Sequence, residues 1–167
     1  FDFFVTGLPA DAENFTESKY LYAGLSLEHE ISDTLNHTII FNRTDSDNET
    51  FDADPVNDVT RGTKDLIKYQ LNYSHSLHSL SALLEHESQE YIQSGPASFF
   101  GDPNKRLKSK TKSIAAEYRV SPGAFNISAS WRLDNNTEFE NANSWRITAN
   151  RQFGAGSEVF VSAGESV

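Results

Sequence analysis

Apolar and polar residues alternate along most of the chain with a period of two. The stretch 118–133 shows this most clearly: after Pro122 and Gly123, apolar residues stand at every second position, with Asn, Ser and Arg between them. Such alternation is typical of a β-strand whose two faces meet different surroundings. Because helical periodicity is nearly absent, we predict an all-β fold.

Eight segments carry the alternation and are predicted to be strands. They cover residues 18–31, 35–45, 64–75, 79–92, 111–120, 124–134, 144–153 and 157–164. Turn-forming residues separate them, which favours antiparallel strands that follow one another in chain order. The sequence therefore predicts an up-and-down meander of about eight strands.

The predicted connections alternate between short and long. The short ones are 32–34, 76–78, 121–123 and 154–156, and the long ones are 46–63, 93–110 and about 135–143. All short turns then lie at one end of the sheet. Outer-membrane barrels have this asymmetry, whereas Greek-key sandwiches mix loop lengths at both ends. We therefore predict that the sheet is part of a larger transmembrane β-barrel.

In a membrane barrel the apolar row of each strand faces lipid and the polar row faces the interior. Aromatic residues near both ends of such rows are typical of membrane girdles. The residues predicted to face lipid are Leu21, Leu25, Leu27, Phe125, Ile127, Trp131 and Trp145. Charges of both signs on the other face, such as Lys68, Glu85 and Arg132, predict an interior network. In a soluble sandwich the same apolar residues would form the core.

The order of short and long connections places both chain ends on the long-loop side. Complete bacterial barrels have both ends on the short-turn side, so residues 1–167 are expected to be one internal barrel segment. A sheet with two open edges exposes unpaired backbone groups. We therefore expect the isolated segment to self-associate.

Composition narrows the functional classes. The formal net charge is −10, which disfavours a nucleic-acid partner. Cys is absent, which excludes disulfides and thiol catalysis. No apolar run approaches the ~18 residues of a membrane helix. No catalytic motif is present, so we do not expect an enzyme.

An acidic segment follows the second predicted strand. It offers five carboxylates, Asp45, Asp47, Glu49, Asp52 and Asp54. Hard oxygen ligands of this kind suit Ca²⁺, so calcium is the one possible cofactor. The spacing fails the EF-hand pattern, because Thr50 stands where that loop needs Gly. A solvated acidic loop is the default interpretation, and calcium binding is the alternative.

The predicted loop 93–110 carries two further candidates for ligand contact. Phe99 and Phe100 lie between Gly-Pro and Gly-Asp-Pro turns, and exposed loop aromatics suit ligand binding or packing on a neighbouring loop. Lys105 and Arg106 begin a basic cluster that extends to Lys112. An ordinary solvated strand end is the default interpretation, and contact with anionic lipopolysaccharide or an anionic chelate at the outer rim of a barrel is the functional one.

The run from Ser144 to Val167, SWRITANRQFGAGSEVFVSAGESV, resembles the later strands of TonB-dependent outer-membrane receptors. The loop GPASFFGDP at 95–103 resembles the cobalamin-receptor-like branch. The resemblance implies a large barrel in the outer membrane of a Gram-negative bacterium, importing an iron chelate, cobalamin or a similar scarce small molecule. It also implies coupling to the TonB complex through a plug domain, which these 167 residues lack.

Two other functions fit the same alternation. One is a complete eight-stranded outer-membrane barrel that acts as an adhesin or anchor. The other is a soluble β-sandwich that acts as a binding module. The position of the chain ends distinguishes the first alternative, and dependence of folding on detergent or lipid distinguishes the second.

Overall fold

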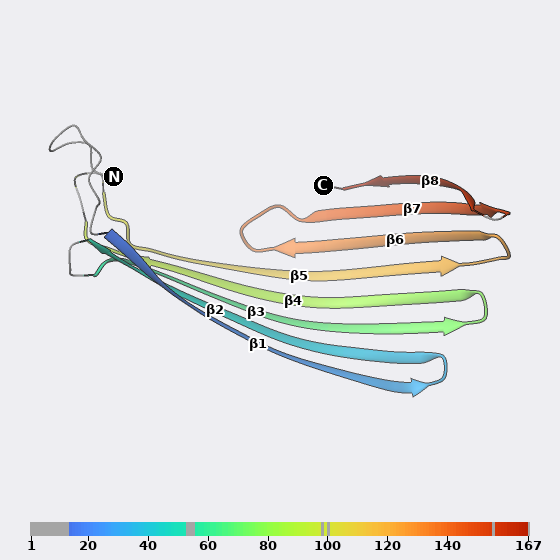
Figure 1. Ribbon diagram of the computed structural model, residues 1–167, viewed down its shortest axis with the longest axis horizontal. Coiled ribbons are helices and arrows are strands. Elements are labelled where there is room, and N and C mark those ends of the chain that lie inside the picture. The colour runs from blue at the N-terminus through green and yellow to red at the C-terminus, as the bar shows by residue number, and fades with distance from the viewer. Residues whose placement is uncertain (1–13, 53–55, 98, 100, 155, 167) are drawn as a thin grey trace. The chain divides into compact units, whose positions relative to one another are not determined.

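The computed structural model describes residues 14–52, 56–97, 99, 101–154 and 156–166, and these residues form one eight-stranded sheet (Figure 1). The strands are β1 (Asn14–Ser32), β2 (Leu35–Asp52), β3 (Val56–His75), β4 (His78–Ser94), β5 (Lys105–Val120), β6 (Phe125–Asn136), β7 (Ala142–Phe153) and β8 (Ser157–Glu165). Their spatial order equals their chain order, and β1 and β8 each have a single neighbour. The predicted all-β meander is confirmed.

Several strands are longer than predicted, and the predicted loop 46–63 is wrong. β2 continues to Asp52 and β3 begins at Val56, so only 53–55, which lie outside the described residues, separate them. The loop predicted at 93–110 shrinks to 95–104 because β5 begins at Lys105. These strand ends contain few apolar residues, so the alternation that reveals a half-buried strand is missing there.

Side-chain hydrogen bonds link the polar strand ends instead. Thr16 and Thr50 lie 3.2 Å apart through their hydroxyl oxygens, and Asn48 Nδ2 donates to Thr60 Oγ1 at 3.4 Å. Cross-strand polar pairs of this kind stabilise paired strands without an apolar face.

Four tight turns connect β1 to β2, β3 to β4, β5 to β6 and β7 to β8, and they lie at the same end of the sheet (Figure 1). Three of them contain a residue in the left-handed region of backbone conformation. These residues are Ser76 (φ 52°), Gly123 (φ 63°) and Gly154 (φ 55°). Glycine adopts this conformation without steric cost, whereas Ser76 does not.

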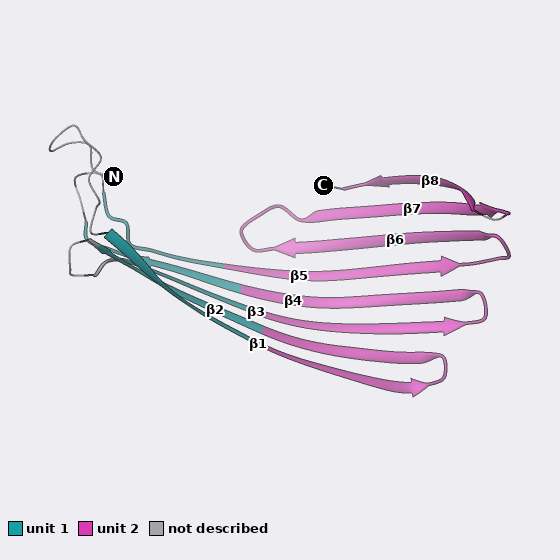
Figure 2. Ribbon diagram, viewed as in Figure 1, with its two compact units in different colours: residues 1–22, 43–64, 89–108 teal, residues 23–42, 65–88, 109–167 magenta. Residues whose placement is uncertain are grey.

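The chain divides into two compact units (Figure 2). Unit 1 contains residues 1–22, 43–64 and 89–108, and unit 2 contains residues 23–42, 65–88 and 109–167. Unit 2 holds the four tight turns and all of β6, β7 and β8.

Pairing of β5 with β6, and of β6 with β7, gives this part of unit 2 two different faces. On one face Ile114 lies opposite Leu133, and Trp131 lies opposite Trp145. On the other face Ser113 lies opposite Asp134, and Ser130 lies opposite Arg146. We call these the apolar face and the polar face of unit 2.

No hydrophobic side chain in the described ranges is buried. The only buried polar residue among them is Ser113, with 5% of its surface exposed. The closed core that a β-sandwich requires is therefore not formed by these residues. Within the same ranges, no helix has the length and apolar character needed to cross a membrane.

Candidate functional site

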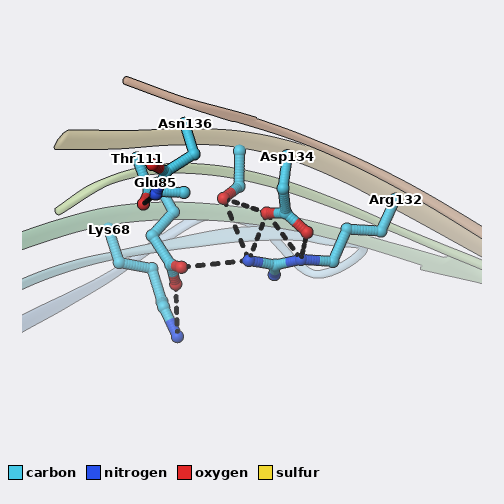
Figure 3. A network of polar contacts seen from close by, with 7 residues as sticks. Lys68, Glu85, Thr111, Arg132, Asp134 and Asn136 are labelled. Atoms are coloured by element: carbon cyan, nitrogen blue, oxygen red, sulfur yellow. Dashed lines mark hydrogen bonds and ion pairs between the residues drawn. The ribbon is translucent and has the colours of Figure 1, made fainter. Parts of the chain in front are cut away.

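A network of charged side chains crosses the polar face of unit 2 and has Arg132 of β6 at its centre (Figure 3). Arg132 Nε donates to both carboxylate oxygens of Asp134, at 3.0 and 2.9 Å. Its Nη2 donates to Glu85 Oε1 of β4 at 3.2 Å and to Ser113 Oγ of β5 at 2.9 Å. Lys68 Nζ of β3 lies 3.1 Å from Glu85 Oε2. Four neighbouring strands are thereby linked through their side chains.

Small residues on β5 make this network possible. Ala115 lies opposite Arg132, and Ser113 lies opposite Asp134. Adjacent strands are about 4.8 Å apart, so β4 and β6 are separated by about twice that distance. Arg132 can reach across β5 to Glu85 because neither Ala115 nor Ser113 fills the space between them.

The network balances its own charge. Two cations, Lys68 and Arg132, meet two carboxylates, Glu85 and Asp134. The Glu85 side chain is only 14% exposed, and both of its oxygens have a cationic partner. A partly buried carboxylate needs such partners, since removing a charge from water without a counter-charge is unfavourable.

A hollow of about 450 Å³ lies beside the network. Gln70, Glu117, Ser130, Arg132 and Arg146 are among the residues that line it. Leu83, Trp131 and Trp145 line it as well, so the hollow offers an apolar surface together with hydrogen-bonding and charged groups. The geometry supports binding, because nothing in this set resembles a nucleophile with its activating base.

Further hydrogen bonds continue along the polar face toward the tight turns. Asn72 Nδ2 donates to Asn36 Oδ1 at 2.9 Å, which joins β3 to β2. The hydroxyls of Ser128 and Thr148 lie 2.6 Å apart and join β6 to β7. This face is therefore tied together by side chains as well as by the backbone ladder.

The residues predicted to face lipid lie exposed. The exposed set includes Leu21 of unit 1 and, in unit 2, Leu25, Leu27, Phe125, Ile127, Trp131 and Trp145. The structure brings Trp131 and Trp145 together as opposite residues of β6 and β7. It also places Arg151 opposite Phe125, with the guanidinium carbon 4.8 Å from the ring centre.

The acidic segment predicted to bind calcium lies mainly in β2 of unit 1. Asp45 accepts hydrogen bonds from Arg43 and from Thr63 Oγ1, and Asp47 accepts one from Arg61. The Arg43 hydrogen bond, followed by that of Thr63, holds the pKa of Asp45 below its usual range.

The remaining acidic candidates are described only in part. Glu49 lies in β2, nothing is described of the Asp52 side chain, and Asp54 lies outside the described residues. Where side chains are described, no three acidic or histidine residues gather into a group that could hold a metal ion. Calcium binding by the five carboxylates stays a prediction.

The basic candidates lie in β5 of unit 1, not in a loop. Lys105 is exposed at the first position of that strand. Arg106 Nε donates to Glu90 Oε1, and Lys108 Nζ lies 3.6 Å from Glu90 Oε2. The hydrogen bond from Arg106 is the main reason why the pKa of Glu90 is lowered. Arg106 is thus engaged with a carboxylate of the neighbouring strand β4.

The aromatic candidates lie in the connection between β4 and β5. Phe99 is 99% exposed, and Phe100 lies outside the described residues. Asn104 closes the base of this connection: its Oδ1 accepts from the Gly95 backbone N at 3.1 Å, and its Nδ2 donates to the Gly95 carbonyl at 3.2 Å. Asp102 accepts from the Asn104 backbone N at 2.9 Å, and this bond is the main cause of its lowered pKa.

Sequence reasoning missed Ser113, Asp134 and Arg151. Ser113 and Asp134 fall on the polar rows of the predicted strands 111–120 and 124–134, but the sequence does not show that they lie opposite each other, because that depends on the register of the two strands. Arg151 falls on the apolar row of β7, where a charge breaks the pattern. That break was the available signal.

No protein-family model matches the chain, and no curated protein matches it. A functional assignment therefore rests on the geometry of the two faces of the sheet.

Proposed function

We propose that this chain forms part of the wall of an outer-membrane β-barrel, in a nutrient receptor of the TonB-dependent kind. The apolar face contacts lipid, and the polar face lines the interior. One observation carries the proposal. The described residues bury no apolar side chain, while the polar side chains of unit 2 are joined into a network around Arg132.

Energetics support lipid as the cover of the apolar face. Exposed apolar surface costs about 25 cal/mol per Å² in water, and the exposed residues include Leu25, Ile127 and Trp131. On β5, β6 and β7 the exposed apolar side chains lie opposite one another, as Ile114 and Leu133 or Trp131 and Trp145 do. A contiguous apolar patch marks a surface that another phase or partner covers. Lipid hydrocarbon covers such a patch without any need for shape complementarity. This suits an apolar face that is built from side chains of several neighbouring strands.

The length of the apolar rows also supports the proposal. The apolar positions of β6 extend from Phe125 to Leu133, which is about 26 Å at roughly 3.3 Å per residue. A strand tilt of 35–45° reduces this to about 20 Å along the membrane normal, close to the apolar band of outer-membrane barrels. Trp131 and Trp145 lie toward one end of this band, and Phe125 lies at the other.

The polar face supplies the interior of such a barrel. The charge-balanced network fixes the wall across β3 to β6, and the hollow beside it offers polar contacts to a passing or resting molecule. In a TonB-dependent receptor this face would meet the plug domain. The nutrient would be an iron chelate, cobalamin or a comparable polar small molecule, and Phe99, Lys105 and Arg106 are candidates for its first contact.

Fluorescence quenching tests the lipid-facing orientation. The chain is refolded into vesicles that contain brominated phospholipids, with Trp131 and Trp145 as the only two Trp residues. We expect strong quenching by brominated acyl chains and weak quenching by aqueous iodide. A folded, monodisperse protein in plain buffer whose Trp residues respond to neither quencher would contradict the proposal and indicate a closed core.

Transport is tested separately in Gram-negative cells that produce the protein. Uptake of labelled cobalamin or of labelled ferric chelates is compared with and without a functional TonB gene. We expect uptake that requires TonB. TonB-independent uptake, or none for any chelate tested, would remove the receptor assignment while leaving the lipid-facing orientation intact.

A further inference from the structure

Arg151 is a charged residue on the apolar face of unit 2. Register places it opposite Phe125 on one side and opposite Val159 on the other. Its guanidinium carbon lies 4.8 Å from the centre of the Phe125 ring and 4.6 Å from the centre of the Phe153 ring. Within the described part of the chain it has no carboxylate partner. Two aromatic rings therefore hold the cation in place.

The position of Arg151 explains how a charge is tolerated there. It lies two residues before the end of β7, next to the tight turn that leads into β8. Phe125, its opposite residue, is the first residue of β6 and follows another tight turn. Arg151 therefore lies at the edge of the apolar band, where cationic side chains reach the lipid headgroups.

Contact with the two phenyl rings leaves the N–H groups of the Arg151 guanidinium available for hydrogen bonds. A guanidinium has five N–H donors in a planar fork, and contact with ring faces consumes none of them. That fork matches the oxygen atoms of a phosphate, which it binds through paired, charge-assisted hydrogen bonds. The surrounding residues, Phe125, Phe153 and Val159, offer an apolar surface and no competing anion.

We propose that Arg151, held between Phe125 and Phe153, binds the phosphate of a phospholipid headgroup at the tight-turn boundary of the membrane. This inference rests on the proposed lipid-facing orientation. A phospholipid is favoured over free phosphate because the flanking rings and Val159 would contact its glycerol and acyl chains. The contact would fix the depth of β6, β7 and β8 in the bilayer.

Native mass spectrometry of the full chain, released from micelles supplemented with phosphatidylglycerol, tests the site. We expect Arg151→Gln to lower lipid occupancy about tenfold and Arg151→Lys, which keeps the charge but loses the fork, to lower it less. Arg119→Gln is the matched control, because Arg119 lies near the same end of the sheet on the polar face, and it should retain lipid. Equal occupancy in all four proteins would overturn the proposal.

Two further arms separate the possible failures. Inorganic phosphate at millimolar concentration should not displace the lipid, and complete displacement would show a simple anion site instead. Quenching by brominated lipid reports orientation independently of Arg151. Retained quenching with unchanged lipid occupancy would reject only the headgroup site, whereas loss of quenching in the unaltered chain would reject the proposed orientation itself.

Discussion

Trp131 of β6 and Trp145 of β7 are opposite residues in register and lie on the same face of the sheet. Each indole N–H has an acceptor toward the end of the sheet away from the tight turns. Trp131 Nε1 donates to Asn143 Oδ1 at 2.7 Å, and Trp145 Nε1 donates to Glu165 Oε2 at 3.3 Å. An apolar ring with a satisfied polar edge suits the boundary between hydrocarbon and water.

Ala129 lies near the middle of the apolar row of β6, opposite Tyr118 and Ile147. We expect Ala129→Arg to lower the free energy of unfolding from lipid vesicles by about 2–4 kcal/mol, because a cation would lie in hydrocarbon. Unfolding by guanidinium, followed by Trp fluorescence, measures the change.

Ser130→Arg is the control for this substitution. Ser130 is the next residue, faces the hollow, and lies between Glu117 and Arg146. There the new cation meets both signs of charge and water, so the loss should stay below about 1 kcal/mol. If Ala129→Arg and Ser130→Arg lowered the free energy of unfolding equally, the two faces of the sheet would have the same environment, and the lipid-facing assignment would be wrong.

Arg132 connects two carboxylates that otherwise lack a shared counter-charge. Replacing it by Met leaves Asp134 without its main partner and Glu85 with Lys68 alone. We expect a loss of about 1–3 kcal/mol in the free energy of unfolding, typical of a partly buried charged group left unsatisfied. Denaturant titration in vesicles measures it.

Arg119→Gln controls for the loss of one positive charge. Arg119 pairs with Glu117 two residues away on the same strand, and its side chain is largely exposed. Such pairs contribute about 0–1 kcal/mol. If Arg132→Met costs no more than Arg119→Gln, the network does not stabilise the wall.

Ser76 in the turn between β3 and β4 has φ 52°, a conformation that disfavours residues with a Cβ atom. We expect Ser76→Gly to stabilise the protein by about 0.5–1 kcal/mol, since relief of strain exceeds the added freedom of the unfolded chain. Thermal or denaturant unfolding measures it. Gly123→Ala, which introduces a Cβ at φ 63°, should change stability in the opposite direction, and the same sign for both would contradict the strain argument.

The sequence predicted the meander well because one face of each central strand is apolar. In β6, the row from Phe125 to Leu133 alternates without interruption, and its predicted bounds differ from the observed ones by at most two residues. Two of the tight turns could be predicted equally well, because Gly123 and Gly154 adopt positive φ angles, which other residues adopt only with steric strain.

The same reasoning failed where both faces of a strand are polar. Residues 46–52 continue β2 without an apolar row, so they looked like a loop. Their pairing depends on contacts such as Ser46 Oγ to the Gly62 carbonyl at 3.4 Å, which join residues far apart in sequence. The contacts of Arg132 could not be predicted from the sequence for a similar reason. They depend on the register of the strands and on the small size of Ala115, which lies opposite Arg132.

Asp45 provides a test of the polar part of β2. Because Arg43 and Thr63 hydrogen-bond its ionised form, the pKa of Asp45 in the folded protein lies below its ordinary value near 3.8. A lowered carboxyl pKa adds stability above the unfolded value, and this stability is lost as pH falls through the folded value. Carboxyl ¹³C NMR titration should therefore show Asp45 ionised down to unusually low pH.

Arg43→Gln should raise the titration midpoint of Asp45 toward its ordinary value, because it removes the largest cause of the shift. Arg61→Gln is the control, since Arg61 hydrogen-bonds Asp47 instead. It removes the same charge from the same unit and should leave the midpoint of Asp45 nearly unchanged. Equal effects of the two variants would mean that general charge, and not the hydrogen bond from Arg43, sets the pKa of Asp45.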